Sequence, residues 1–240
     1  MNALWFIPSF LLLALLALLI RRGVYKSFRC FFAYSLFAVA ADLARFLVRK
    51  SPPAYYATYY VTEAGYELLG ILVMYEVLRA ALAGLARAWT VRLIFPAVVL
   101  ASILLSLARV QTASAHFNRL TYYILAGEVA TRSSQVIVFA GLVTLIPLLG
   151  LRWRQYAFGI ATGFGLYSTV MLLTTTAFSD FGTRFKFLWG LTSLVAYSVT
   201  VIIWIWFFSA AQKPDTPILE LLAPSPGDLK HYKDALRRMR

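Results

Sequence analysis

Long apolar runs, separated by short polar segments, dominate this chain. Seven stretches are long enough to cross a bilayer as helices: 4–20, 28–48, 58–79, 92–109, 119–149, 155–178 and 186–209. A hydrocarbon core about 30 Å thick needs roughly 20 helical residues. Transmembrane strands would alternate between apolar and polar positions, whereas runs such as 11–20 and 199–208 are apolar throughout. The pattern predicts an all-α, polytopic membrane protein, a bundle of seven transmembrane helices.

Composition supports a lipid-facing surface. Of the 240 residues, 61% are hydrophobic, whereas a soluble domain has about 45–50% apolar residues. The formal net charge is +13, which in a soluble protein would suggest nucleic acid. In a membrane protein the same charges are topology signals at helix ends. We therefore expect the lipid bilayer, and no nucleic acid, as a partner.

The basic residues indicate how the bundle is oriented. Most of the 23 Lys and Arg residues follow odd-numbered spans or lie in the C-terminal tail. Because cytoplasmic loops are enriched in these residues, the N-terminus is predicted outside and the C-terminus inside. No basic residue precedes the first apolar stretch and no cleavage site follows it, so we expect a retained helix. Tryptophan, which prefers the membrane boundary, falls near predicted helix ends at positions 5, 89, 153, 189, 204 and 206.

The chain divides into a bundle and a tail. Residues 1–210 contain all seven predicted spans, and residues 211–240 form a cytoplasmic segment that begins as a proline-containing linker. Within 225–240, apolar and basic residues alternate at helical spacing, which predicts a short basic amphipathic helix. Such a helix can lie on an anionic membrane surface or bind a membrane or cytoplasmic protein partner. A solvated tail is the third possibility.

Ionisable residues recur inside the predicted spans. The second span holds Asp42 and Arg45, the third Glu63 and Glu67, and the fifth Glu128 and Arg132. Each pair is three or four residues apart, which places both members on one helix face. A charge at membrane depth costs about 2.5–3.5 kcal/mol on insertion scales, so such residues face the bundle interior and find partners. The alternating helix directions place all six in the outer half of the bilayer.

Tyrosines belong to the same predicted layer, among them Tyr59, Tyr66 and Tyr123. Together these groups predict an outward-opening polar cavity in which carboxylates outnumber guanidinium groups. That excess favours a small cationic ligand, or a proton held by one or more of the carboxyl groups. The alternative is a structural ion-pair network that joins the second, third and fifth helices.

Two further spacings concern helix packing. Gly159 and Gly163 form a small-xxx-small pattern in the sixth span, which permits close helix contact inside the bundle or in a dimer. Glu76 and Arg79 lie three apart near the inner end of the third span. We expect them to form an ordinary ion pair at the helix end.

Several chemistries lack their required residues. Retinal needs a lysine in the middle of the seventh helix, but the seventh span holds only Lys186 at its edge. The only histidines, His116 and His231, lie in a predicted loop and in the tail. Zinc hydrolysis, haem ligation and a Ser–His protease are therefore not supported. We expect no enzyme, no cofactor and no metal site.

Four segments carry a resemblance to known proteins: 59–79, 128–145, 151–168 and 196–208. Together they resemble a family of uncharacterised bacterial seven-helix integral membrane proteins, and the likeness extends over most of residues 1–210. The resemblance implies a multi-pass protein of the bacterial inner membrane. The family has no assigned activity, so the likeness implies no substrate and no site residue.

Three functions fit these patterns. The first is a receptor- or sensor-like protein that binds a small ligand in the outward-facing cavity and signals through the inner loops or tail. The second is a small transporter or channel that uses the intramembrane carboxylates for cations or protons. The third is an accessory subunit of a larger membrane complex. Ligand binding without flux, flux in proteoliposomes, and stoichiometric copurification with a partner would distinguish them.

Overall fold

The computed structural model describes residues 7–81, 89–111, 119–148, 155–181 and 186–210. Within these ranges the chain is all-helical, with no strand. The helices are α1 (Ile7–Arg21), α2 (Arg29–Val48), α3 (Pro52–Ala81), α4 (Trp89–Gln111), α5 (Arg119–Leu148), α6 (Gln155–Phe181) and α7 (Lys186–Ser209), with a short 3-10 turn η2 (Val24–Lys26). The predicted tail helix, Trp5, Trp153 and His116 lie outside the described residues.

The helix bounds follow local sequence chemistry. Gly23 has a φ of 68°, a conformation that residues with a side chain rarely adopt, and it ends the α1 segment before η2. The third helix begins at Pro52, several residues before the predicted span. Proline suits the first turn of a helix, because its missing N–H would have no intrahelical partner there. The tyrosine-rich segment after Pro52 is therefore helical.

Apolar character supports a membrane protein. Three described segments are long and apolar enough to cross a bilayer: Arg29–Val48, Tyr156–Thr174 and Gly190–Ser209. Ile7–Arg21 and Phe95–Leu105 are shorter apolar helices. The chain is therefore a helical protein with at least three membrane-span-like helices. The seven-span topology and its orientation remain predictions.

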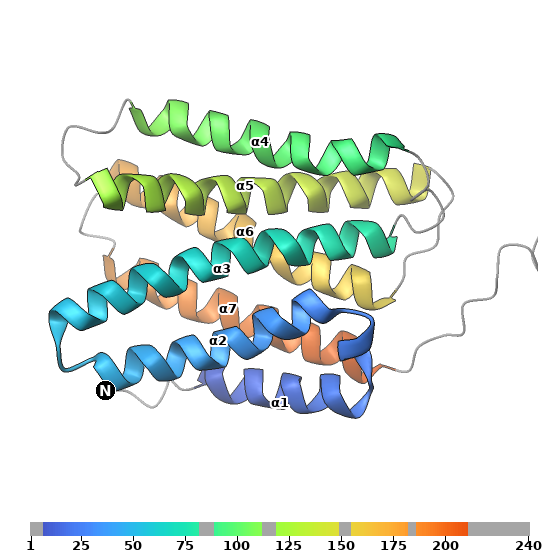
Figure 1. Ribbon diagram of the computed structural model, residues 1–240, viewed down its shortest axis with the longest axis horizontal. Helices are drawn as coiled ribbons and strands as arrows, with labels where there is room; N and C mark the ends of the chain where they lie inside the picture. The colour runs from blue at the N-terminus through green and yellow to red at the C-terminus, as the bar shows by residue number, and fades with distance from the viewer. Residues whose placement is uncertain (1–6, 82–88, 112–118, 149–154, 182–185, 211–240) are drawn as a thin grey trace, which may run out of the picture. The chain divides into compact units, whose positions relative to one another are not determined.

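Successive helices run in alternate directions (Figure 1). Helix α1 packs against α2 and α7, α2 against α3, and α3 against both α5 and α6. Helices α5, α6 and α7 pack in sequence order, while α4 packs chiefly on α5 at the edge of the bundle. The beginning of α1, α3 and α7 and the end of α2 and α6 consequently share one end of the bundle.

An aromatic core fills the opposite end, where α2 begins and α7 ends. The ring of Phe31 lies 5.0 Å from that of Trp204 and 5.6 Å from that of Phe208, and all three are almost fully buried. Trp204 lies near the end of α7, as predicted, and its side chain turns into this core. Its indole N–H donates to the carbonyl of Ile160 at 3.4 Å. The core closes this end of the bundle and leaves the other end open for a cavity.

Small residues set the distance between α6 and α7. A Cβ placed on Gly159 would lie 2.5 Å from the ring of Phe207, and one on Gly163 would lie 2.1 Å from Nε1 of Trp204. The small-xxx-small pattern therefore serves packing within the bundle, as one of the two interpretations of the sequence predicted.

Glu76 has a different role from the predicted one. Its carboxylate accepts hydrogen bonds at 3.1 Å from the backbone N–H groups of Cys30 and Phe31, in the first turn of α2. The described residues show no ion pair between Glu76 and Arg79. The first N–H groups of a helix lack intrahelical partners and carry partial positive charge. A carboxylate from α3 therefore caps α2, an arrangement that spacing along α3 could not predict.

Candidate ligand-binding pocket

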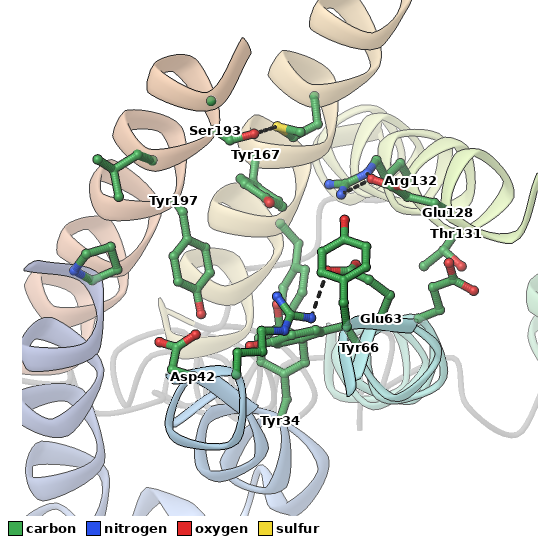
Figure 2. Close-up of a pocket in the computed structure, with 18 of the residues that line it drawn as sticks. Tyr34, Asp42, Glu63, Tyr66, Glu128, Thr131, Arg132, Tyr167, Ser193 and Tyr197 are labelled. Carbon is green, nitrogen blue, oxygen red and sulfur yellow. Dashed lines mark hydrogen bonds and ion pairs between the residues drawn. The ribbon is translucent and has the colours of Figure 1, made fainter. Parts of the chain in front are cut away.

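A cavity of about 510 Å³ lies among α1, α2, α3, α5, α6 and α7. This volume falls in the range of small-molecule sites, about 300–1,000 Å³. Most of its walls come from the half of the bundle where α2 ends and α3 begins. Tyr34 and Phe164, whose rings contact Trp204 of the aromatic core, also line it. Figure 2 shows carboxylates, guanidinium groups and tyrosines from separate helices turned into this space.

The predicted site residues converge on this cavity, with one exception. The predicted residues that line it are Asp42, Arg45, Tyr59, Glu63, Tyr66, Glu67, Glu128 and Arg132. The exception is Tyr123, which lies in α5 with a side chain outside the described part of the structure. Helical spacing explains the convergence, because residues three, four or seven apart share a face.

One ion pair joins α2 to α3. Arg45 Nη2 lies 3.0 Å from Oε1 of Glu63, and Arg45 Nε donates to the hydroxyl of Thr62 at 2.8 Å. The guanidinium carbon lies 4.8 Å from the ring centroid of Tyr59 and 5.6 Å from that of Tyr66. Both contacts are within the range of cation–π attraction. Arg45 is therefore held by a carboxylate, a hydroxyl and two rings.

The second ion pair lies within α5. Arg132 Nη2 is 2.5 Å from Oε1 of Glu128, four residues earlier, and Arg132 Nε donates to the same oxygen at 3.0 Å. The guanidinium carbon lies 5.1 Å from the ring centroid of Tyr167 on α6. Among the described residues, the two ion pairs are separate and no ion pair joins α5 to α2 or α3. This differs from the alternative of one network across three helices.

Two carboxylates of the pocket have no arginine partner in the described part of the chain. Asp42 Oδ2 accepts a hydrogen bond from the hydroxyl of Ser9 at 2.7 Å. Glu67 Oε1 is buried and has no hydrogen-bond partner among the described residues. The Glu67 carboxylate packs on Gly127 of α5, where an added Cβ would lie 2.6 Å from Oε2. Each arginine of the pocket is paired with one glutamate, so the charges of Asp42 and Glu67 are not balanced by an arginine. With its carboxyl groups ionised at neutral pH, the pocket therefore has an excess of negative charge.

Several wall residues were not among the predicted site residues. Those with polar side chains are Ser9, Tyr34, Tyr55, Thr131, Gln135, Tyr167, Ser193 and Tyr197. Helical spacing in the sequence could have predicted some of them. Tyr34 precedes Asp42 by two helical turns and Ser193 precedes Tyr197 by one turn, so each pair shares a helix face. Ser9 had no such signal, since a lone serine in an apolar helix is common. Gln135 accepts a hydrogen bond from the buried hydroxyl of Ser168, which links α5 to α6.

A second, smaller cavity of about 220 Å³ lies among α3, α4 and α5. Glu67 and Thr131 line both cavities and therefore form part of the wall between them. Apolar residues that are exposed on the surface of the bundle, including Leu68 and Ile103, also line the smaller cavity. Glu67 thus lies where two spaces meet.

Within the described ranges, no group of three or more His, Cys, Asp or Glu residues could hold a metal ion. The side chains of the pocket suit binding by charge, hydrogen bonds and ring faces. Comparison with protein-family models, curated proteins and solved structures gives no match for this chain. The resemblance to bacterial seven-helix membrane proteins therefore stays a prediction, and function has to be argued from the pocket itself.

Proposed function

We propose that this chain is a seven-helix protein of the bacterial inner membrane, with its N-terminus outside, that binds a small ligand in the polar pocket and acts as a receptor or sensor. The pocket then opens toward the outer face. The cytoplasmic loops and the tail would pass the signal to a partner. The observation that carries the proposal is the cavity of about 510 Å³, with polar walls supplied by six helices.

Exposed apolar side chains support the proposed topology. Phe10 on α1 is 69% exposed, Leu105 on α4 is 63% exposed and Trp206 on α7 is 66% exposed. Soluble proteins rarely expose large contiguous apolar surfaces. Helices of 23 to 30 residues, as in α3 to α7, are about 35–45 Å long and can span a tilted path through the bilayer.

The position of Glu67 supports a second candidate, a small cation or proton transporter. A carboxylate between two cavities can exchange a cation or proton with either one. Intramembrane carboxylates commonly mark such pathways. Binding and flux separate the two candidates, since a receptor binds its ligand without moving it.

The test uses the full chain in detergent micelles and in proteoliposomes. A panel of small cationic, neutral, zwitterionic and anionic metabolites is screened for compounds that raise the thermal midpoint. A receptor requires a compound that stabilises the protein, loses its effect when Arg132 and Glu128 are replaced by Gln, and shows no uptake into proteoliposomes. Uptake with the same specificity would favour the transporter. A panel without any stabilising compound, together with constant copurification of another membrane protein, would favour the accessory subunit.

A further inference from the structure

Asp42 differs from the paired carboxylates of the pocket. Glu63 and Glu128 are each matched by an arginine, whereas the hydrogen bond that Asp42 receives comes from the neutral hydroxyl of Ser9. Arg45 lies one turn further along α2, but its nitrogens contact Thr62 and Glu63. The negative charge of Asp42 is therefore available to a ligand.

A hydroxyl group without a partner faces this carboxylate. The hydroxyl of Tyr197 is buried and makes no hydrogen bond with the described residues. Figure 2 shows the Tyr197 hydroxyl, from α7, and the Asp42 carboxylate, from α2, pointing toward one another. Buried polar atoms almost always have partners, and one without a partner requires an explanation. A ligand group that donates hydrogen bonds to both oxygens would satisfy the two residues together.

The rings around this point suit a cation. Other tyrosines of the pocket already lie under cations, since Arg45 contacts Tyr59 and Arg132 contacts Tyr167. Tyr197 lines the same cavity and has no cation–π contact among the described residues. Tyrosine faces attract ammonium groups, more strongly when the site is desolvated.

Cavity size favours an organic cation over a bare inorganic ion. A water molecule takes about 30 Å³ of liquid volume, and the cavity of about 510 Å³ is many times larger. The described residues also lack a cluster of metal ligands. An anionic ligand is disfavoured because both arginines of the pocket are already paired with glutamates.

We infer that the ligand is a small organic ammonium ion, whose charged nitrogen lies between the Asp42 carboxylate and the Tyr197 hydroxyl and whose carbon skeleton packs on the tyrosine rings. This inference rests on the proposed function, because it names the chemical class that the same pocket accepts. A primary ammonium group donates to both oxygens. A quaternary ammonium group keeps the charge and ring contacts but has no N–H to donate.

The experiment compares three probes by calorimetry on the full chain in an uncharged detergent. The probes are phenethylammonium, its N-trimethyl derivative, and the uncharged phenethyl alcohol. We expect both cations to bind at least tenfold more tightly than the alcohol. Asp42→Asn should weaken both cations at least tenfold. Tyr197→Phe should weaken the primary ammonium severalfold and leave the N-trimethyl cation within a factor of two.

Two substitutions serve as matched controls. Tyr75→Phe removes the hydroxyl of an exposed tyrosine at the other end of α3, and Asp215→Asn removes a carboxylate from the tail, outside the described residues. Neither should change the affinity for any of the three probes. If Asp42→Asn does not fold, Tyr197→Phe serves as the test. Weaker binding of the primary ammonium alone supports the inference, and an equal effect or no effect on both cations contradicts it.

The outcomes separate this inference from the function on which it rests. Equal affinity for the alcohol and the cations, or unchanged cation affinity in Asp42→Asn, would overturn the inference. The same holds if sodium ions displace both probes at millimolar concentration, because the site would then hold an inorganic cation. If only neutral or anionic compounds bind, and pocket substitutions abolish that binding, the ligand class is wrong and the receptor proposal stands. If no compound of any class binds, both fail.

Discussion

Replacement of Gly163 by alanine tests the packing that shapes the bundle. The new methyl group would lie 2.1 Å from Nε1 of Trp204 and 2.7 Å from its Cε2. Ordinary contacts begin near 3.4 Å, so the indole would have to move by about 1.3 Å. The indole has little room to move, because Trp204 is 1% exposed and its ring centroid is 5.0 Å from that of Phe31 and 5.1 Å from that of Phe164.

The expected cost follows from two effects. Overpacking a filled core costs about 1–3 kcal/mol. Displacement of the indole also strains its hydrogen bond to Ile160, and such a bond contributes about 0.5–1.5 kcal/mol. Alanine recovers up to about 1 kcal/mol of helix propensity relative to glycine. Gly163→Ala should therefore lower the free energy of unfolding by about 1–3 kcal/mol.

The assay is unfolding in mixed micelles as the fraction of SDS is raised, followed by far-UV circular dichroism and tryptophan fluorescence. Gly141→Ala is the matched control, because a Cβ at Gly141 would meet nothing within 4 Å while the helix-propensity gain is the same. This variant should be as stable as the parent protein or slightly more stable. Equal stability of the two variants would refute the packing described for α6 and α7. A Gly163→Ala protein that keeps its stability but changes its oligomeric state would instead support a dimer interface.

Three further predictions concern the cap, the pocket and the topology. Glu76→Ala should lower the free energy of unfolding by about 2 kcal/mol in the same SDS titration, because two backbone N–H groups of α2 lose a charged acceptor. Arg79→Ala should lower it by less than about 0.5 kcal/mol. A larger decrease would indicate that Glu76 and Arg79 form an ion pair after all. Gly127→Ala should displace the Glu67 carboxylate, 2.6 Å from the added Cβ, and alter ligand affinity more than Gly141→Ala does; equal affinities would argue against a role for Glu67. A green fluorescent protein fused after Arg240 should fluoresce, and alkaline phosphatase at the same position should be inactive, if the C-terminus lies inside; the opposite pattern would reverse the predicted orientation.

Helix content was readable from the sequence because a long apolar run has few alternatives to a helix when its backbone cannot bond to water. Most bounds of the described helices agree with the predicted spans within a few residues. The largest difference between a predicted and an observed bound is at the start of α3, which begins at Pro52 with a polar, tyrosine-rich helical segment. Hydropathy could not detect it, since the residues are helical without being strongly apolar.

The site was predictable only in part. Charged residues within long helical stretches, such as Asp42, Glu63 and Arg132, stand out in an apolar chain, and the alternation of helix direction places them at one end of a bundle. Their pairing did not follow from spacing alone. Arg45 contacts Glu63 on the next helix, whereas Arg132 contacts Glu128 on its own. Which glutamate each arginine contacts depends on how the helices are rotated relative to one another. The residue pattern of a single helix does not contain this information.

By itself, the sequence determined the helical class of the chain, the approximate bounds of its helices and the gathering of its ionisable residues in one part of the bundle. These properties depend on composition and on the 3.6-residue period, both of which are local. Tertiary structure alone decided that Ser9 donates to Asp42, that Tyr197 turns toward the same carboxylate, and that Glu76 caps α2. Such contacts join residues far apart in the chain, and they depend on the rotation and separation of whole helices, which glycines and core aromatics set.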